Sequence, residues 1–212
     1  MIYFLLTFVI LKKNTKGGKQ MNNEVTISGI VTSVEFDHEI YGEKFYMVNL
    51  SVERQSGISD NIPVMVSDRY TILTKDKIGE FIKVIGQFRS YNKAENERKK
   101  LVLFVFAEEI IFDEPYPVNN ILLEGYICKQ PTFRQTPLGR QISDVILAVN
   151  RTYGKSDYIP IVVWGRNAKY ASNMDVGDYI HIKGRIQSME YVKNEQIHIA
   201  YEVSTQQIEK MI

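Results

Sequence analysis

Aromatic and cationic side chains share one side of two β-rich stretches in the second half of the chain. On the first stretch, 158–164, Tyr158 and Trp164 fall on one side and aliphatic residues fall on the other. On the second stretch, the outward positions carry Tyr179, His181, Lys183, Arg185, Gln187, Met189 and Tyr191. Flat rings stack on unpaired bases and cations neutralise phosphates, so the pattern favours a surface for single-stranded nucleic acid. Ordinary surface residues and a dimer interface are the two alternatives.

The surrounding sequence supplies strands that would position these side chains. Five β-rich segments are separated by Gly, Pro or polar turns: 120–128, 142–150, 158–164, 179–191 and 196–203. Residues 167–173, after the third segment, favour a short helix. Inward-facing Ile180, Ile182 and Ile186 would seal a core. This order predicts an all-β OB-fold, a five-stranded Greek-key barrel with a short helix between strands 3 and 4; the pattern also fits another small barrel.

The same domain occurs twice in the chain. Shifts of 97 and 98 residues align many identical residues, among them Arg54/Arg151, Asp60/Asp157, Gly86/Gly184 and Ser90/Ser188. A period this long excludes a solenoid of about 20–50-residue repeats, so each copy should have its own core. We expect tandem OB-fold domains at 22–113 and 118–212, joined by a linker at 114–117 that two prolines stiffen.

Residues 1–20 stand apart from both copies. The apolar run 1–11 is too short for a membrane-spanning helix, which needs about 20 residues. Positive charge follows this run instead of preceding it, unlike a secretory signal. Codons for Lys16-Gly17-Gly18 can contain a bacterial ribosome-binding sequence ahead of Met21. We therefore expect a non-native leader from a mis-assigned start, disordered or a short helix, with a membrane anchor as the alternative.

Composition excludes several other classes of protein. The 212 residues contain 26 Lys+Arg, 25 Asp+Glu and 44% hydrophobic residues, near the averages for soluble globular chains. One cysteine excludes an internal disulfide and a Cys-rich zinc site. The acidic residues are scattered through turn-like positions, so we expect no catalytic residue, no metal, no cofactor and no small-molecule substrate. An OB-fold nuclease, a secreted oligosaccharide-binding protein and a primosome-type or scaffold module that binds proteins are the competing hypotheses.

The second copy resembles the bacterial single-stranded DNA-binding protein family. Ordered segments over some 90 residues carry the resemblance: 118–125, 130–139, 147–151, 161–165 and 183–188. The sharpest are Pro131-x-x-Arg134-x-Thr136-Pro137-x-Gly139 and Val162-Val163-Trp164-Gly165. The resemblance implies an OB barrel that binds and protects single-stranded DNA without sequence preference or catalysis, in replication, recombination or repair. It also implies a cytoplasmic protein, nucleoid-associated when bound to DNA, that does not act at a membrane.

The resemblance also implies which residues meet the DNA. Its base-stacking rings fall at Tyr153, Tyr158, Trp164 and Tyr191. Its phosphate contacts fall at Arg151 and Arg166. From their position and charge we add four further phosphate contacts: Lys155, Lys183, Arg185 and Lys193. Four OB domains per assembly are common in the family, so we expect a homodimer. The family's acidic tail has no counterpart after 206–212, which puts partner recruitment by that route in doubt.

The first copy departs from this pattern. Ser56, Asn61 and Ser67 stand where the second copy has three of its rings. Residues 22–113 carry 11 Lys+Arg against 15 Asp+Glu, whereas residues 118–212 carry 11 against 9. Weaker contacts remain at Arg54, Arg69, Arg89 and Tyr91. We therefore predict that the second barrel is the principal binder and that the first supplies an assembly surface or a weaker groove. Equal binding by both is the alternative.

Overall fold

The protein is built almost entirely of β-strands. The computed structural model describes residues 22–70, 75–95, 98–112, 116–151, 154–193 and 195–211, so the expected leader at 1–20 lies outside the described residues. The first half contains β1 (Asn23–Ile40), β2 (Glu43–Glu53), β3 (Ser59–Ser67), β4 (Phe81–Glu95) and β5 (Arg98–Ile111). The second half contains β6 (Asn119–Gln135), β7 (Gln141–Asn150), β8 (Ser156–Trp164), β9 (Tyr179–Lys193) and β10 (Gln196–Lys210).

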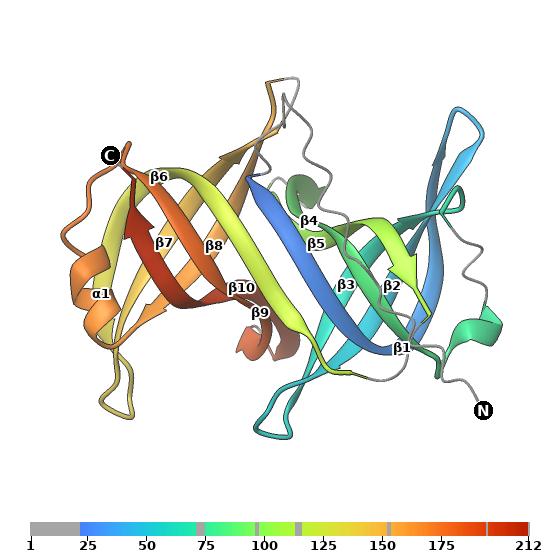
Figure 1. Cartoon of the computed structure of the whole chain (residues 1–212), viewed down its shortest axis with the longest axis horizontal. Coiled ribbons are helices and arrows are strands. Elements are labelled where there is room, and N and C mark those ends of the chain that lie inside the picture. Colours follow the sequence, from blue (N-terminus) through green and yellow to red (C-terminus); the bar gives the residue numbers. More distant parts are fainter. Residues whose placement is uncertain are drawn as a thin grey trace, which may run out of the picture.

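Each half closes into a barrel. In the first, β1 pairs with β2, β2 with β3, β3 with β5, β5 with β4, and β4 returns to β1. The second repeats this circuit as β6–β7–β8–β10–β9 and back to β6. The third and fifth strands of each barrel are parallel and all other neighbours in the barrel are antiparallel. This confirms the predicted pair of OB-folds (Figure 1).

The element after the third strand differs between the barrels. In the second barrel it is helix α1 (Arg166–Ala171), whose Ala168 and Ala171 are buried. The carbonyl of Ala168 accepts a hydrogen bond of 2.8 Å from the Ser143 hydroxyl on β7, which fixes the helix to the barrel. In the first barrel the described residues at this place form a short 3-10 helix, η1 (Lys75–Lys77).

Aliphatic side chains fill both barrels in the alternation that the sequence predicts. On β9 the buried set contains Ile180, Ile182 and Ile186, and each is 0% exposed. Glycine is required where β4 and β9 cross their partner strands most closely. A Cβ at Gly86 would collide with the Phe106 carbonyl, and one at Gly184 would collide with that of Ser204. The matched glycines of the two copies therefore serve barrel closure.

The two barrels join through one antiparallel strand pair. Residues 23–27 of β1 pair with residues 119–123 of β6, with Val25 opposite Ile121 at the centre, so all ten strands form a continuous sheet (Figure 1). Two asparagines bracket this junction symmetrically. Asn23 exchanges side-chain hydrogen bonds of 2.7 and 2.8 Å with the backbone of Phe88. Asn119 does the same with Ile186 at 2.8 and 2.9 Å. The barrels are thus related by an approximate two-fold axis.

Candidate nucleic-acid interface

The outer face of β8 presents two of the predicted stacking rings. Tyr158 is 45% exposed, and Trp164 is half-buried on the same side of the strand. The indole N–H of Trp164 donates to the Ser204 hydroxyl on β10 at 3.1 Å, which satisfies its one polar group and fixes the ring. The backbone N–H of Tyr158 donates to the Ser90 hydroxyl on β4 at 2.8 Å, so this tyrosine lies at the junction of the barrels.

The other predicted rings and lysines are more dispersed. Tyr191 is 43% exposed near the end of β9, where its ring stacks with His198 of β10 at 5.5 Å between centroids. Exposed cations surround the second barrel at Lys155, Arg166 and Lys183. Tyr153 lies outside the described residues, and so does the side chain of Lys193.

Arg151 forms a contact between the two barrels. Its Nε donates to a carboxylate oxygen of Asp157 at 2.6 Å, and its Nη2 donates to the carbonyl of Ser90 at 3.0 Å. The backbone N–H of Ser90 donates to the same carboxylate at 2.5 Å. Asp157 is 0% exposed, so this clasp pairs a buried carboxylate with a partly exposed arginine and ties β8 to β4.

A matching clasp is built around Arg54 on the other flank of the junction. Its Nε donates to Asp60 at 2.7 Å and its Nη2 donates to the carbonyl of Ser188 on β9 at 3.2 Å. The Ser188 N–H donates to Asp60 at 2.6 Å. Burial alone would raise the pKa of Asp60, but the hydrogen bonds from Arg54 and Ser188 outweigh it and hold that pKa below its usual range. The identical residues aligned by the sequence repeat are therefore junction residues.

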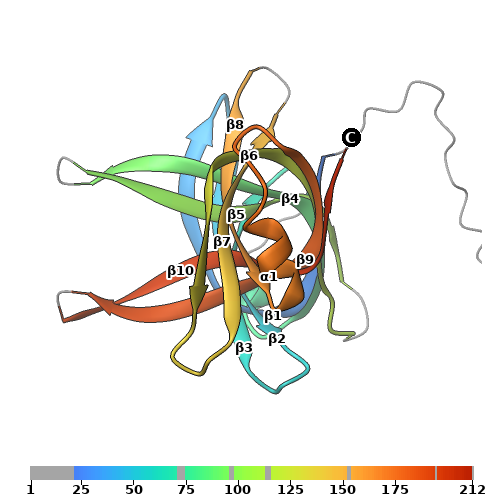
Figure 2. The same cartoon turned by 90° about the vertical axis from the view of Figure 1, so that its left-hand side faces the viewer.

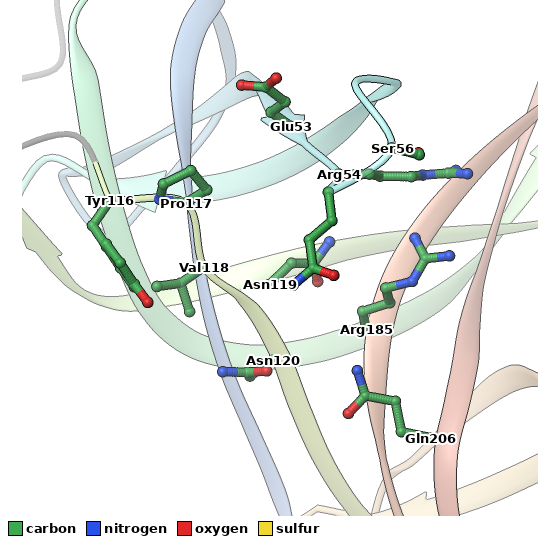
Figure 3. Close-up of a pocket in the computed structure, with 11 residues that line it drawn as sticks. Glu53, Arg54, Ser56, Tyr116, Pro117, Val118, Asn119, Asn120, Arg185 and Gln206 are labelled. Atoms are coloured by element: carbon green, nitrogen blue, oxygen red, sulfur yellow. The ribbon is translucent and has the colours of Figure 1, made fainter.

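Arg185 lines a pocket between the two barrels, beside the second clasp. Its Nη1 lies 3.9 Å from an Asp60 oxygen, and within the described part of the chain this buried nitrogen has no hydrogen-bond partner. Burial lowers the pKa of Arg185, and the positive charge of Arg54 lowers it further. The pocket has a volume of about 650 Å³ and includes Tyr116, Asn119 and Gln206 in its wall (Figure 3).

Besides Arg54, the residues predicted on the first barrel fall in two places. Arg69, which is exposed, forms an ion pair of 2.9 Å with Glu43. Arg89 and Tyr91 lie together on β4. The Arg89 guanidinium lies 3.8 Å from the centroid of the Phe106 ring, and Tyr91 meets Phe104 edge-on at 5.8 Å.

Sequence reasoning missed three rings on this barrel. The ring of Phe45 stacks on His38 at 4.8 Å and lies 6.4 Å from Phe106. Phe106 alternates with the core residues Val105 and Ala107, so it lies on the outer side of β5. This alternation is visible in the sequence, and it is the signal that could have separated the outer rings from core aromatics.

The second barrel is similar in sequence to known proteins. The family model described as the single-strand binding protein family matches residues 118–211. The match therefore runs through the whole second barrel, from β6 to β10. A single-stranded DNA-binding protein of Clostridium tetani is 38% identical over 81 residues, or 35% of this chain and 56% of that protein. The single-stranded DNA-binding protein A of Bacillus subtilis is 34% identical over 86 residues, or 37% of this chain and 49% of that protein. The chain thus spans about half the length of these curated relatives.

Solved structures resemble the whole two-barrel fold. The wild-type single-stranded DNA binding protein from Thermus aquaticus matches with a TM-score of 0.72 at 21% identity, covering 90% of this chain and 93% of that one. A deletion mutant of the same protein matches with a TM-score of 0.70 at 22% identity, covering 90% and 94%. The tandem arrangement is therefore a known fold. Within the described ranges, no helix is both long and apolar enough to cross a bilayer.

Proposed function

We propose that this protein binds single-stranded DNA without sequence preference and without catalysing a reaction. One observation carries the proposal: Tyr158 and Trp164 lie partly exposed on one side of β8, while aliphatic residues on the other side seal the core. The segment that holds both rings matches the single-strand binding protein family, and its curated relatives are named single-stranded DNA-binding proteins. Protection of unpaired DNA in replication, recombination or repair, in the cytoplasm, follows from this activity.

Binding rests on stacking supplemented by charge. Each stacked base contributes about 1–3 kcal/mol by alanine substitution, and any base can stack because every base has a π-face. Trp164 is held ready by its hydrogen bond to Ser204, so little side-chain freedom is lost when a base arrives. Lys155, Arg166 and Lys183 are the exposed cations that neutralise phosphates. Arg151 serves instead to hold the barrels together, because its guanidinium already donates to Asp157 and Ser90.

Two long hairpins flank the binding face. The β4–β5 and β9–β10 hairpins project from the same side of the molecule (Figure 2). Tyr191 and His198, near the outer end of the second hairpin, stack on each other and offer a further aromatic surface. In this proposal a bound strand lies between the hairpins, and two chains associate into a homodimer that presents four barrels. Sedimentation at micromolar concentration tests the dimer, and a monomer would contradict it.

Titration with oligo-dT tests the binding activity. The chain contains one tryptophan, Trp164, so stacking of a thymine on it should quench the protein's tryptophan fluorescence. A fluorescently labelled oligo-dT then reports the affinity of Trp164→Ala by anisotropy. We expect a loss of about 5- to 150-fold with unchanged thermal unfolding. Unquenched tryptophan together with equal affinity of both proteins would refute the proposed site.

A further inference from the structure

Four flat side chains form an unbroken row on the outer face of the first barrel. His38 stacks on Phe45 with 4.8 Å between ring centroids and an interplanar angle of 11°. Phe45 lies 6.4 Å from Phe106, and the Arg89 guanidinium covers Phe106 at 3.8 Å. The row crosses β1, β2, β5 and β4, and its four members are only partly buried. None of the four belongs to the buried core of the barrel, which aliphatic side chains and Phe88 fill.

The row surrounds the position that Trp164 fills in the second barrel. Ser67 occupies that position on β3, and Phe45 lies opposite it as Ile142 lies opposite Trp164. Phe106 pairs with Met65 of β3 as Ser204, the partner of the indole, pairs with Val162 of β8. The first barrel therefore lacks an indole at this place but brings two phenyl rings to it from neighbouring strands.

The row ends beside the rings of the second barrel. Arg89 directly precedes Ser90, whose hydroxyl accepts the Tyr158 N–H and whose carbonyl accepts Arg151. Burial lowers the pKa of Arg89, and the nearby charge of Arg151 lowers it further. Tyr158 is thus hydrogen-bonded to Ser90, the residue next to the Arg89 end of the row, where β4 of the first barrel meets β8 of the second.

We propose that His38, Phe45, Phe106 and Arg89 form a second base-stacking platform, reached by the same unpaired strand after it leaves Tyr158. The proposal rests on the proposed function, since the strand first binds the second barrel. Bases stack on both aromatic rings and arginine planes, and the partly buried members of the row supply both kinds of group. Because residues 22–113 carry more acidic than basic groups, stacking supplies most of this binding and phosphate contacts supply little.

Two lengths of oligo-dT distinguish binding at the platform from binding at the Tyr158 and Trp164 site of the second barrel. An oligomer of about 10 nucleotides occupies a single OB-fold, and one of about 35 reaches both. We expect Phe106→Leu and Arg89→Lys each to bind the long oligomer about 5- to 150-fold more weakly than the unaltered protein does. Both variants should bind the short oligomer as tightly as the unaltered protein does. Arg89→Lys retains the charge, so its loss would report the flat guanidinium.

A matched control comes from the same barrel. Phe112 also carries a cation over its ring, Lys77 at 5.4 Å, but it lies outside the row. Phe112→Leu should bind both oligomers like the unaltered protein, and unchanged thermal unfolding shows that each variant is folded. Equal long-oligomer affinity of Phe106→Leu, Arg89→Lys and the unaltered protein would refute the platform while leaving the proposed function intact. Failure of the unaltered protein to bind either oligomer would refute the proposed function.

Discussion

The two barrels agree where they touch and differ where they face outward. Both have an asparagine that brackets the central strand pair, Asn23 in one and Asn119 in the other. Both have an arginine–aspartate clasp that holds a serine of the other barrel. The junction imposes the same geometry on each half, so the same residues satisfy it.

The junction does not constrain the residues on the outer faces of the barrels in this way. Where the second barrel has Gln187, which hydrogen-bonds to Glu202 at 2.6 Å, the first has Arg89, whose guanidinium covers the ring of Phe106. Where the second has Trp164, the first has Ser67. Internal similarity therefore identifies the scaffold, and internal difference marks the faces on which we propose that the ligand binds.

Breaking one clasp should have the largest effect. Asp157→Ala leaves Arg151 without its charge partner and the Ser90 N–H without its acceptor. Removing one member of a buried pair costs about 3–5 kcal/mol, so we expect that loss in the free energy of unfolding measured by urea denaturation. The control is Asp144→Ala, because Asp144 pairs with Arg134 while both side chains are exposed. It should cost less than about 1 kcal/mol, and equal costs for the two variants would contradict the clasp.

Matched positions on the third strands test the functional difference. Tyr158→Ala should weaken oligo-dT binding by about 5- to 150-fold through loss of one stacked base. Asn61 occupies the corresponding position of the first barrel, so Asn61→Ala should leave the affinity unchanged. Anisotropy of labelled oligo-dT measures both. A loss at Asn61 as large as that at Tyr158 would show that the first barrel uses its third strand in the same way.

Acid should weaken the clasp at Asp60. Its pKa is lowered in the folded protein, so its ionised form stabilises the fold above the unfolded Asp pKa of about 3.9. This contribution disappears as pH falls through the lower folded value. Urea unfolding of Asp60→Asn and of the unaltered protein should therefore differ at neutral pH, begin to converge below about pH 3.9, and agree only below the folded pKa of Asp60. A constant difference across that range would exclude the titration of Asp60.

The smallest effect concerns salt. Lys155 is exposed immediately before β8. If it neutralises one phosphate, Lys155→Gln should reduce the magnitude of the salt slope of oligo-dT binding by about 0.7. Lys210 is the control because its ammonium already pairs with Asp178 at 2.7 Å. Affinities at several salt concentrations measure the slopes, and the same reduction for both lysines would argue against a specific contact at Lys155.

Alternation of apolar and polar residues predicts the strands of the fold, but it does not predict where two of them end. Alternating isoleucines identify the inner side of β9 because inside and outside repeat every second residue. The sequence predicts strands that end at Cys128 and Val203, but β6 continues to Gln135 and β10 to Lys210. The β10 extension is held by pairing up to Lys210 opposite Ile180, a partner that local sequence does not reveal.

Some features of the candidate site are likewise predictable from local sequence, and others depend on contacts between distant residues. The exposure of Tyr158 and Trp164 follows from strand alternation alone. The contact of Arg151 depends on Ser90, 61 positions away in the chain and in the other barrel. Phe45 and Phe106 come together only through the pairing of their strands with β3, so neither ring stands out in its own segment.

The two-fold relation centred on Val25 and Ile121 has a consequence for any directional ligand. A nucleic-acid chain runs from a 5′ end to a 3′ end, and rotation by half a turn reverses that direction. A strand that crosses both barrels therefore meets the second one backwards compared with the first. Ring positions that fit one direction of passage do not fit the other unless the strand turns back on itself.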